Sequence, residues 1–391
     1  MISSKRNICV FTSTRAEYGL LRSLLRLIQA SSQLYLKLLV SGTHLKAEQG
    51  MTIEEIVHDG FEPHECIDID LSDDSTEGIS KSMGLAVSGY GRYFAKHRPD
   101  IVVLLGDRFE TFCCAAAAQI SRIPIAHIHG GETTEGAVDE AFRHSITKMA
   151  HIHFPSCEQY THRIIQMGES PAHVFNVGAL GAENIKLMTF LNRSQLEQSI
   201  GFRLDAPFFL ITFHPVTLEG KTSHDQFAEL LLAMNQFPDH KCIFTYANAD
   251  TDSRVINQMI HDYGKLNSNR CYIAPSLGYL RYLSAMKLCD AVIGNSSSGI
   301  LEAPVLGVPS INIGDRQRGR IRTESTVDCH PACESIVGAI KKIYSEKFRS
   351  CLRNLKVPWD KLGTAKEITD ILSRTNLSGI LKKEFYDIEF R

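Results

Sequence analysis

The sequence predicts an α/β fold made of two Rossmann-like, doubly wound domains, and three observations support this prediction. Short apolar runs recur along the chain, and most are continuous rather than alternating, as in parallel strands that helices cover on both faces. Amphipathic helical patterns separate these runs, which is typical of βαβ units. The length of 391 residues favours more than one domain. About eleven strands are too many for one sheet, so we expect two sheets of roughly five to seven strands.

The expected strands alternate with helices in chain order. The helix expected at 18–30 places leucines on one face, and Thr14 and Glu17 before it have the spacing of a capping box. The expected strands are residues 8–12, 34–40, 101–105, 123–128, 151–154, 174–177, 208–213, 242–246, 271–273, 291–293 and 310–313.

The boundary between the domains is expected after the strand at 174–177. Residues 187–203 have the pattern of an exposed helical connector, and a new strand follows it. Near the end of the chain a proline and a glycine interrupt the pattern, and a last helix is expected at 364–373. We therefore expect a first domain of residues 1–177 plus 363–391 and a second domain of residues 178–362.

Composition excludes several classes of protein. The chain has 42 Lys and Arg against 44 Asp and Glu, a net charge of −2, which argues against binding to nucleic acid or to a membrane surface. The 11 cysteines are scattered without a CxxC pair, which disfavours a disulfide framework and a structural zinc site. The start has no signal-peptide pattern, and no apolar run approaches the ~18 residues that span a bilayer. We expect a cytoplasmic protein.

Polar residues gather where the expected strands end. Ligands of open α/β sheets bind outside the carboxyl ends of the strands. With two such domains, we expect both sets of strand ends to face one cleft between them. The segments concerned are residues 12–17, 41–44, 106–110 and 129–133 in the first half, and residues 214–217, 248–250, 294–299 and 314–320 in the second.

In the second half, the segment 294–302 reads as a strand end, a turn of small residues and the start of a helix. Free backbone N–H groups and the hydroxyls of Ser296 and Ser297 would hold an anion there. Glu302, expected about two helical turns later, could bind the hydroxyls of a ribose. Arg316 follows the next strand with three further arginines, which favours a phosphate group nearby. The alternatives are simple helix capping and solvated surface arginines.

In the first half, several acids follow the expected strands. Asp107 ends an apolar strand, Glu132 follows two glycines, and Asp139 opens a helix. Acids that converge on one cleft suit general acid and base chemistry, because their environments can separate their pKa values. The alternative for Asp139 is a charge that complements the helix dipole. The alternative for Glu140 is a surface partner of His144, one helical turn later.

Two pairs of alternating histidines raise the possibility of a metal hydrolase. His127 with His129, and His151 with His153, have the spacing of side chains on one face of a strand, where histidines can bind zinc or iron. No HExxH motif is present, and hydrogen-bonded histidines inside strands are common. No GxSxG motif of a serine hydrolase occurs either.

Several blocks of sequence resemble one enzyme family, the hydrolysing UDP-N-acetylglucosamine 2-epimerases, which include enzymes of the bacterial sialic-acid pathway. The blocks occur in the same order over most of the chain. Where the non-hydrolysing epimerases usually carry His-Arg-Arg-Glu-Asn, this chain has Phe-His-Pro-Val-Thr at 213–217. The blocks are Thr-Arg-Ala-Glu-Tyr at 14–18, Gly-Asp-Arg-Phe-Glu at 106–110, His-Gly-Gly-Glu at 129–132, Asp139 with Arg-His-Ser-Ile-Thr-Lys at 143–148, His-Pro-Val-Thr at 214–217 and Gly-Asn-Ser-Ser at 294–297.

The resemblance implies a fold like the two-domain glycosyltransferase-B architecture, with a nucleotide sugar in the cleft and a C-terminal helix that crosses back onto the first domain. It also implies a reaction in nonulosonic (sialic) acid biosynthesis. UDP leaves C1 as the C2 proton is removed, which gives 2-acetamidoglucal. Hydration with inversion at C2 then gives N-acetylmannosamine. The family uses no NAD for this step and no catalytic metal, so no cofactor is expected.

The family's functional residues map onto this sequence position by position. Its catalytic acids match Asp107, Glu132 and Asp139, and an active-site histidine matches His44. Which acid removes the C2 proton stays open. The matching nucleotide contacts are Arg15, Arg108, His214, Asn248, Ser296, Ser297, Glu302 and Arg316.

Several alternatives stay open within and beside this resemblance. Sister enzymes act on UDP- or GDP-linked N,N'-diacetylbacillosamine in the legionaminic acid pathway. A glycosyltransferase of the same architecture, or a nucleotide-sugar sensor without activity, would also bind UDP. The family suggests a homodimer or homotetramer. No residues follow position 391, so a fused kinase domain is not expected.

Overall fold

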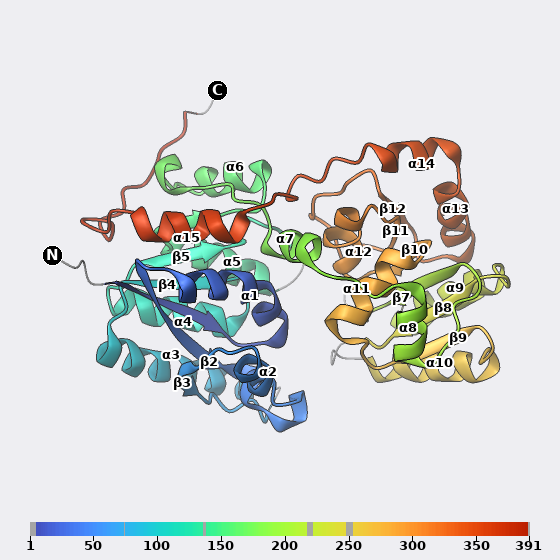
Figure 1. Cartoon of the computed structure of the whole chain (residues 1–391), viewed down its shortest axis with the longest axis horizontal. Coiled ribbons are helices and arrows are strands. Elements are labelled where there is room, and N and C mark those ends of the chain that lie inside the picture. The colour runs from blue at the N-terminus through green and yellow to red at the C-terminus, as the bar shows by residue number, and fades with distance from the viewer. Residues whose placement is uncertain (1–4, 74, 136–137, 217–221, 248–252, 390–391) are drawn as a thin grey trace. The chain divides into compact units, whose positions relative to one another are not determined.

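Two six-stranded parallel sheets, each covered by helices on both faces, organise the chain (Figure 1). The computed structural model describes residues 5–73, 75–135, 138–216, 222–247 and 253–389. Contacts divide the chain into two compact units, the first of Met1–Asn184 with Pro358–Arg391 and the second of Ile185–Val357. None of the described helices is long and apolar enough to cross a membrane.

The first unit follows the expected alternation of strands and helices, with short 3-10 helices labelled η. Its elements are β1 (Arg6–Thr12), α1 (Arg15–Ala30), β2 (Leu34–Ser41), η1 (Gly42–Leu45), η2 (Ala47–Gln49), α2 (Ile53–His58), β3 (Pro63–Ile67), α3 (Thr76–His97), β4 (Ile101–Leu105), α4 (Phe109–Ile120), β5 (Ile125–Ile128), α5 (Asp139–Met149), β6 (Ile152–Phe154), α6 (Glu158–Gln166), η3 (Pro171–His173), α7 (Leu180–Leu187), which runs across the boundary, and α15 (Thr364–Arg374).

The second unit repeats the same alternation. Its elements are α8 (Arg193–Ile200), β7 (Phe208–Thr212), α9 (Ser223–Asn235), β8 (Lys241–Thr245), α10 (Ser253–Leu266), β9 (Cys271–Ala274), α11 (Gly278–Leu288), β10 (Ala291–Gly294), α12 (Ser298–Leu301), η4 (Pro304–Leu306), β11 (Ser310–Ile313), β12 (Thr326–Cys329), α13 (Cys333–Ile343) and α14 (Glu346–Arg353).

The two sheets have the same topology. Their strand orders are β3-β2-β1-β4-β5-β6 and β12-β11-β10-β7-β8-β9. In each unit the chain builds outward from its first strand in one direction, then returns and builds in the other. The order therefore reverses between β1 and β4, and again between β7 and β10. These are the points where doubly wound folds bind their ligands, so the prediction of two Rossmann-like domains is confirmed.

The continuous apolar runs are explained by a core on each face of each sheet. All five residues of β4 are buried. Ile101, Val103 and Leu105 face one cluster with α1 and α15, whereas Val102 and Leu104 face the other with α3 and α4. Because both faces of such a strand are buried, its sequence does not alternate between apolar and polar residues.

The start of α1 forms as the sequence predicts. The Glu17 N–H donates to Thr14 Oγ1 at 3.4 Å, and the Thr14 N–H donates to Glu17 Oε2 at 3.2 Å. The same carboxylate accepts from the Ser13 N–H at 2.8 Å. The capping box therefore fixes the direction in which α1 leaves the carboxyl end of β1.

Two edge strands were missed and one predicted strand is wrong. β3 and β12 lie at sheet edges, where their residues are mostly half-buried or exposed, so they lack a continuous apolar run. Residues 174–177, predicted as a strand, form a single bridge between Val174 and His153. The predicted helical connector at 187–203 contains α8, which is mostly exposed and packs only Leu196 and Ile200 into a core cluster of the second unit.

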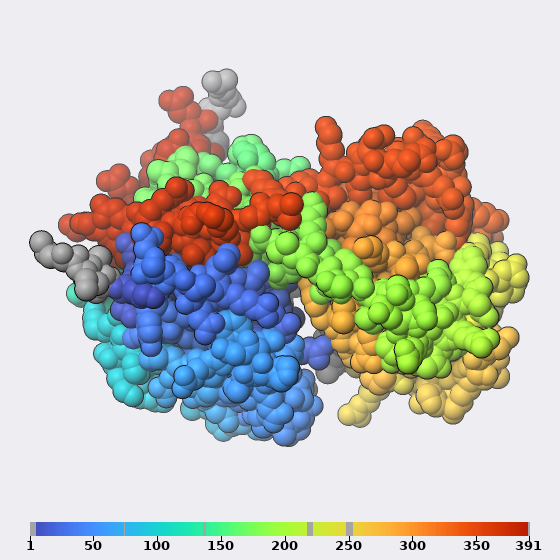
Figure 2. Space-filling model, in the orientation of Figure 1, coloured from blue at the N-terminus to red at the C-terminus, as the bar shows by residue number. Residues whose placement is uncertain are grey.

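The first unit includes residues 178–184 and 358–362, which the sequence pattern assigns to the second domain. The Ala179 N–H donates to the Trp359 carbonyl at 2.9 Å. The buried Glu183 accepts from the N–H groups of Gly363 at 2.7 Å and Ala365 at 2.8 Å. These bonds fix the start of α15, which packs on α1 as a red helix beside the blue N-terminal region in Figures 1 and 2.

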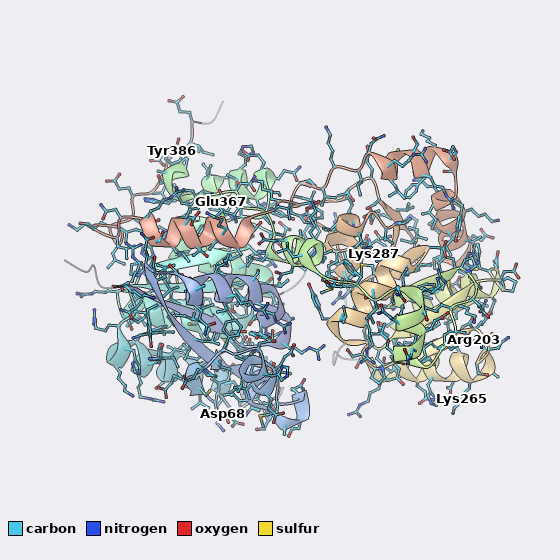
Figure 3. All side chains as sticks on the ribbon, in the orientation of Figure 1. Asp68, Arg203, Lys265, Lys287, Glu367 and Tyr386 are labelled. Carbon is cyan, nitrogen blue, oxygen red and sulfur yellow. The ribbon has the colours of Figure 1, made fainter. Side chains whose placement is uncertain are left out.

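Replacing Glu183 with alanine should destabilise the first unit by about 1–3 kcal/mol, because the buried Ala365 N–H and the partly buried Gly363 N–H lose their acceptor. Chemical denaturation followed by a probe on α15 would measure the change. The matched control is Glu367→Ala, whose side chain is exposed on the first turn of the same helix (Figure 3). Equal stability of the two variants would contradict this account of the C-terminal crossover.

Candidate active site

One guanidinium holds two of the predicted catalytic acids together in the first unit. Arg143 on α5 is only 3% exposed. It forms an ion pair with Asp107, which follows β4, and its Nη1 lies 3.5 Å from Glu132 Oε2, beyond β5. A buried cation in contact with two carboxylates is stable only while both partners stay in place. The carboxyl ends of these two neighbouring strands therefore carry one linked charge cluster.

Glu132 owes its position to a tight turn after β5. Gly131 has φ +75°, and a Cβ there would lie 2.6 Å from the Tyr160 carbonyl oxygen, so the turn requires glycine. The buried Glu132 carboxylate accepts from the Ser156 hydroxyl at 3.0 Å and lies 3.0 Å from His129 Nδ1. Ser156, His129 and Arg143 thus hold the Glu132 side chain in one orientation.

Asp139 is the first residue of α5, as the sequence predicts. Partial desolvation and the neighbouring Asp107 carboxylate raise its pKa, while Arg108 and Arg143 act in the opposite direction. Asp139 is therefore in electrostatic contact with the charge cluster, although it lies exposed at the helix start. The cluster contains carboxyl groups in different environments. Such environments can separate the pKa values of the groups, so that one group acts as an acid and another as a base.

Glu140 is a local partner on α5. Its Oε1 lies 3.2 Å from His144 Nε2, and its Oε2 accepts from the Thr134 N–H at 2.7 Å. The interpretation of Glu140 as the i,i+4 partner of His144 is confirmed.

Further charged groups surround the ends of β1 and β4. Arg108 donates to both oxygens of the fully buried Glu110, at 3.1 and 3.2 Å, with its side chain 43% exposed. Burial and the Glu110 carboxylate raise the pKa of Glu17 to about 7. Arg15, at the first position of α1, is exposed. Both arginines predicted to contact the nucleotide are thus open to solvent at this edge of the sheet.

His44 lies in η1, directly after β2, and is fully buried. Its Nε2 lies 3.0 Å from the Thr12 hydroxyl and its Nδ1 lies 2.8 Å from the Thr52 hydroxyl. Burial lowers its pKa to about 4, so the ring is neutral near pH 7. Its hydrogen bonds go to threonines rather than to the acids around Arg143.

The alternating histidines have protein partners. His127 Nε2 lies 2.8 Å from the Gly106 carbonyl oxygen, and His153 Nε2 lies 2.9 Å from Glu169. Burial lowers the pKa of His127 to about 3. His129 lies beyond the end of β5, so it does not share a strand face with His127. Among the described residues, no group of three or more His, Cys, Asp and Glu side chains could hold a metal ion.

In the second unit, one asparagine joins the ends of three strands. Gly294 ends β10 with φ +136°, where a Cβ would lie 1.9 Å from the Thr212 carbonyl oxygen of β7, so only glycine fits. The next residue, Asn295, is fully buried. Its Oδ1 accepts from the His214 N–H at 2.7 Å and its Nδ2 donates to the His214 carbonyl at 2.8 Å. Its own carbonyl accepts from Arg316 at 3.2 Å.

These bonds place two predicted nucleotide contacts. His214, at the end of β7, and Arg316, beyond β11, are both fixed relative to the end of β10. Burial, with a smaller effect from Arg316, lowers the pKa of His214 to about 4. His214 therefore presents a neutral ring beside a permanent cation.

The serine turn differs from the expected helix start. α12 has only four residues, and η4 begins at Pro304, because a proline stops helix propagation. Glu302 follows α12 directly, so the expectation that it lies two helical turns in is wrong. Burial raises its pKa to about 7. Ser297 makes no side-chain cap, and Ser296 Oγ accepts weakly from the Ser298 N–H at 3.4 Å.

A small cavity lies where the second sheet reverses its strand order, and its lining includes Thr212, Gly294, Ser296 and Asn312. Arg322 shapes the loop that follows β11. It pairs with Asp328 at 3.1 Å and donates to two loop carbonyls. Arg318 and Arg320 line a hollow beside it. The predicted contact Asn248 lies outside the described residues.

The sequence interpretation did not include Arg143, Asn295 or Ser156 among the site residues. Arg143 had a signal, because it lies one helical turn after Asp139 and so on the same face. Asn295 lies in the block at 294–297, but the sequence does not show its contact with His214, and Ser156 had no signal. The partners of both residues come from other strand ends.

The buried His214 should make the second unit less stable in acid. Its folded pKa of about 4 is below the ordinary value of 6.5. Between these values the unfolded chain binds the extra proton, so stability is lost as pH falls from 6.5 to 4. In His214→Gln the slope of unfolding free energy against pH should be shallower by about 1.4 kcal/mol per pH unit. His261→Gln, at a half-exposed position, is the control. An unchanged slope in His214→Gln would contradict this.

Comparison with known proteins gives consistent results. The family model for UDP-N-acetylglucosamine 2-epimerase matches residues 26–373. A Campylobacter jejuni protein named GDP/UDP-N,N'-diacetylbacillosamine 2-epimerase (hydrolyzing) is 42% identical over 386 residues, 98% of this chain and 100% of that protein. The Escherichia coli polysialic acid biosynthesis protein P7 is 39% identical over 388 residues, 98% of each chain.

A solved structure shows the same fold. The UDP-GlcNAc 2-epimerase from Neisseria meningitidis, bound to UDP-GlcNAc, aligns with a TM-score of 0.78 at 18% identity, over 95% of this chain and 100% of that one. Two Rossmann-like units in this order form the glycosyltransferase-B-like architecture. Since the family model covers most of the chain and two relatives exceed 30% identity, the chain belongs to the UDP-N-acetylglucosamine 2-epimerase family.

Proposed function

We propose that the protein is a hydrolysing 2-epimerase that converts UDP-N-acetylglucosamine to N-acetylmannosamine and UDP. The observation that carries the proposal is the cluster of Asp107, Glu132 and Asp139 around Arg143, at the carboxyl ends of β4 and β5. Removing a proton from carbon and returning one to the opposite face needs acid and base groups in different environments.

The reaction has two steps. In the elimination, a base takes the C2 proton, the C–H electron pair forms the C1=C2 bond, and the C1–O bond breaks with its pair on the UDP oxygen. In the hydration, water adds at C1 and a proton adds at C2 from the other face. The acid cluster takes part in these transfers, and partial desolvation with the neighbouring Asp107 carboxylate raises the pKa of Asp139.

We propose that side chains of the second unit bind the diphosphate. Breaking the C1–O bond leaves negative charge on the leaving phosphate, which fixed cations and dipoles stabilise. We assign this role to Arg316, His214 and the hydroxyls of Ser296 and Ser297. The assignment of Arg15 and Arg108 as nucleotide contacts rests on the family resemblance. Glu302 would bind the ribose. The proposed roles of Asn248 as a nucleotide contact and of His44 as an active-site histidine rest on the family resemblance.

A second candidate substrate is UDP- or GDP-linked N,N'-diacetylbacillosamine. It is favoured by the printed name of the Campylobacter jejuni relative, 42% identical over nearly the whole chain. The proposed chemistry is the same, because both sugars carry the 2-acetamido group and the C2 proton. In either case we expect a cytoplasmic homodimer or homotetramer that serves nonulosonic acid synthesis.

A substrate panel tests this proposal. Purified protein should release nucleoside diphosphate from one of the three nucleotide sugars without any acceptor. In deuterium oxide the free sugar should carry deuterium at C2, by NMR or mass spectrometry. Release only when an acceptor sugar is added would indicate a glycosyltransferase instead. Binding without turnover of any of the three would leave the proposal unsupported and favour a sensor.

Variants show whether the acid cluster performs the reaction. Asp107→Asn and Glu132→Gln should lower kcat by at least about 100-fold, as expected for loss of a general acid or base. The matched control is Glu158→Gln, an exposed acid of the same unit that pairs with His162 on α6. Unchanged kcat in both cluster variants would place the chemistry elsewhere.

Asn295 should act on nucleotide affinity by positioning His214 and Arg316. Asn295→Asp replaces the Nδ2 donor with an oxygen facing the His214 carbonyl, so we expect about tenfold weaker UDP binding, a loss of about 1.4 kcal/mol. Calorimetric titration with UDP measures it. Asn267→Ala is the control, because Asn267 bonds to Tyr263 at the amino end of β9, the opposite edge of the sheet. Equal UDP affinity in the Asn295 and Asn267 variants would refute the role.

A further inference from the structure

His129 has a backbone conformation that histidine rarely adopts. It is the first residue beyond β5, and its φ is +66°, in the left-handed region. Its N–H donates to the Phe154 carbonyl at 3.1 Å, which anchors the strained backbone to the neighbouring strand. A side chain in this region costs about 1–3 kcal/mol, and such residues cluster at functional sites. Glycine would relieve the strain, and the chain places glycine at the next two positions instead.

Only one of the two ring nitrogens of His129 has a polar partner among the described residues. Its Nδ1 lies 3.0 Å from Glu132 Oε1, and its side chain is 15% exposed. Its Nε2 is buried and has no hydrogen-bond partner among the residues that the structure describes. A buried polar atom without a partner costs about 1–3 kcal/mol. One residue thus carries both a strained backbone and an unused ring nitrogen.

The contact with Glu132 determines which ring nitrogen carries the proton. A carboxylate oxygen only accepts, so Nδ1 must donate its hydrogen, and in the neutral ring Nε2 then keeps a free lone pair. Glu132 is itself held by the Ser156 hydroxyl and by Arg143. A carboxylate fixed behind a histidine in this way orients the ring and stabilises the imidazolium that forms when Nε2 takes a proton.

We propose that His129 is a catalytic residue whose Nε2 removes the substrate proton, with Glu132 as its orienting carboxylate. The inference rests on the proposed function. In the neutral ring Nε2 has no proton, so it can act first only as a base, and the elimination is the step that begins with a base. The C2 proton bonds to Nε2, the C–H pair forms C1=C2, and the C1–O pair leaves with UDP. The imidazolium then releases this proton to solvent water, which restores the neutral ring.

Asparagine is the decisive replacement, because it tolerates the left-handed conformation better than most residues. His129→Asn should fold with unchanged or greater stability, keep UDP affinity within about threefold, and lose at least about 100-fold in kcat. Arg122→Asn is the matched control. Arg122 has φ +56° at the other end of β5 and is exposed, so its replacement should leave kcat unchanged. A His129→Asn enzyme with kcat within about threefold of wild type would overturn the proposal.

A second measurement is independent of activity. Nitrogen-15 NMR of the intact protein near pH 7.5, with the His129 signals identified by their absence in His129→Asn, should show a proton on Nδ1 and none on Nε2. A proton on Nε2 in the resting protein would overturn the proposal whatever the kinetics show. If wild type acts on no nucleotide sugar, the proposed function fails, whereas the NMR result still decides whether Glu132 orients His129 as a base.

Discussion

All strands of each sheet run in one direction, so all their carboxyl ends meet along one edge. This constraint brings together side chains that are far apart in sequence. Asp107 follows β4, Glu132 follows β5 and Ser156 follows β6, and the parallel register places these strand ends side by side. In the second unit His214, Asn295 and Arg316 follow β7, β10 and β11 in the same way. The sites described above are consequences of this arrangement.

The two units hold their strand ends by different physical means. In the first unit, ion pairs hold the strand ends together. The buried guanidinium of Arg143 needs both Asp107 and Glu132 to offset the free-energy cost of its desolvation. In the second unit, the neutral side-chain amide of Asn295 bonds to the backbone of His214, and the Asn295 carbonyl accepts from Arg316. The first arrangement suits proton transfer between carboxyl groups, and the second suits binding of an anion.

The alternating pattern of strands and helices made most of the fold predictable. Strands buried on both faces, such as β4, have a continuous apolar sequence, and α1 carries a capping box before its apolar face. The edge strands β3 and β12 could not be recognised, because a half-exposed strand has no such run. The four-residue length of α12 was also missed, although Pro304 marks where a helix must stop.

The sequence by itself determined which strand ends are polar, and so named Asp107, Glu132, Asp139, His214, Ser296 and Arg316 as candidates. Only the tertiary structure decided which of these side chains share a partner. Arg143 joins two acids from different strand ends, and Asn295 joins His214 to Arg316, because each contact depends on strand order and register rather than on spacing along the chain. The left-handed backbone of His129 belongs to the same class, since the turn after β5 and its bond to β6 hold a conformation that residues other than glycine seldom adopt.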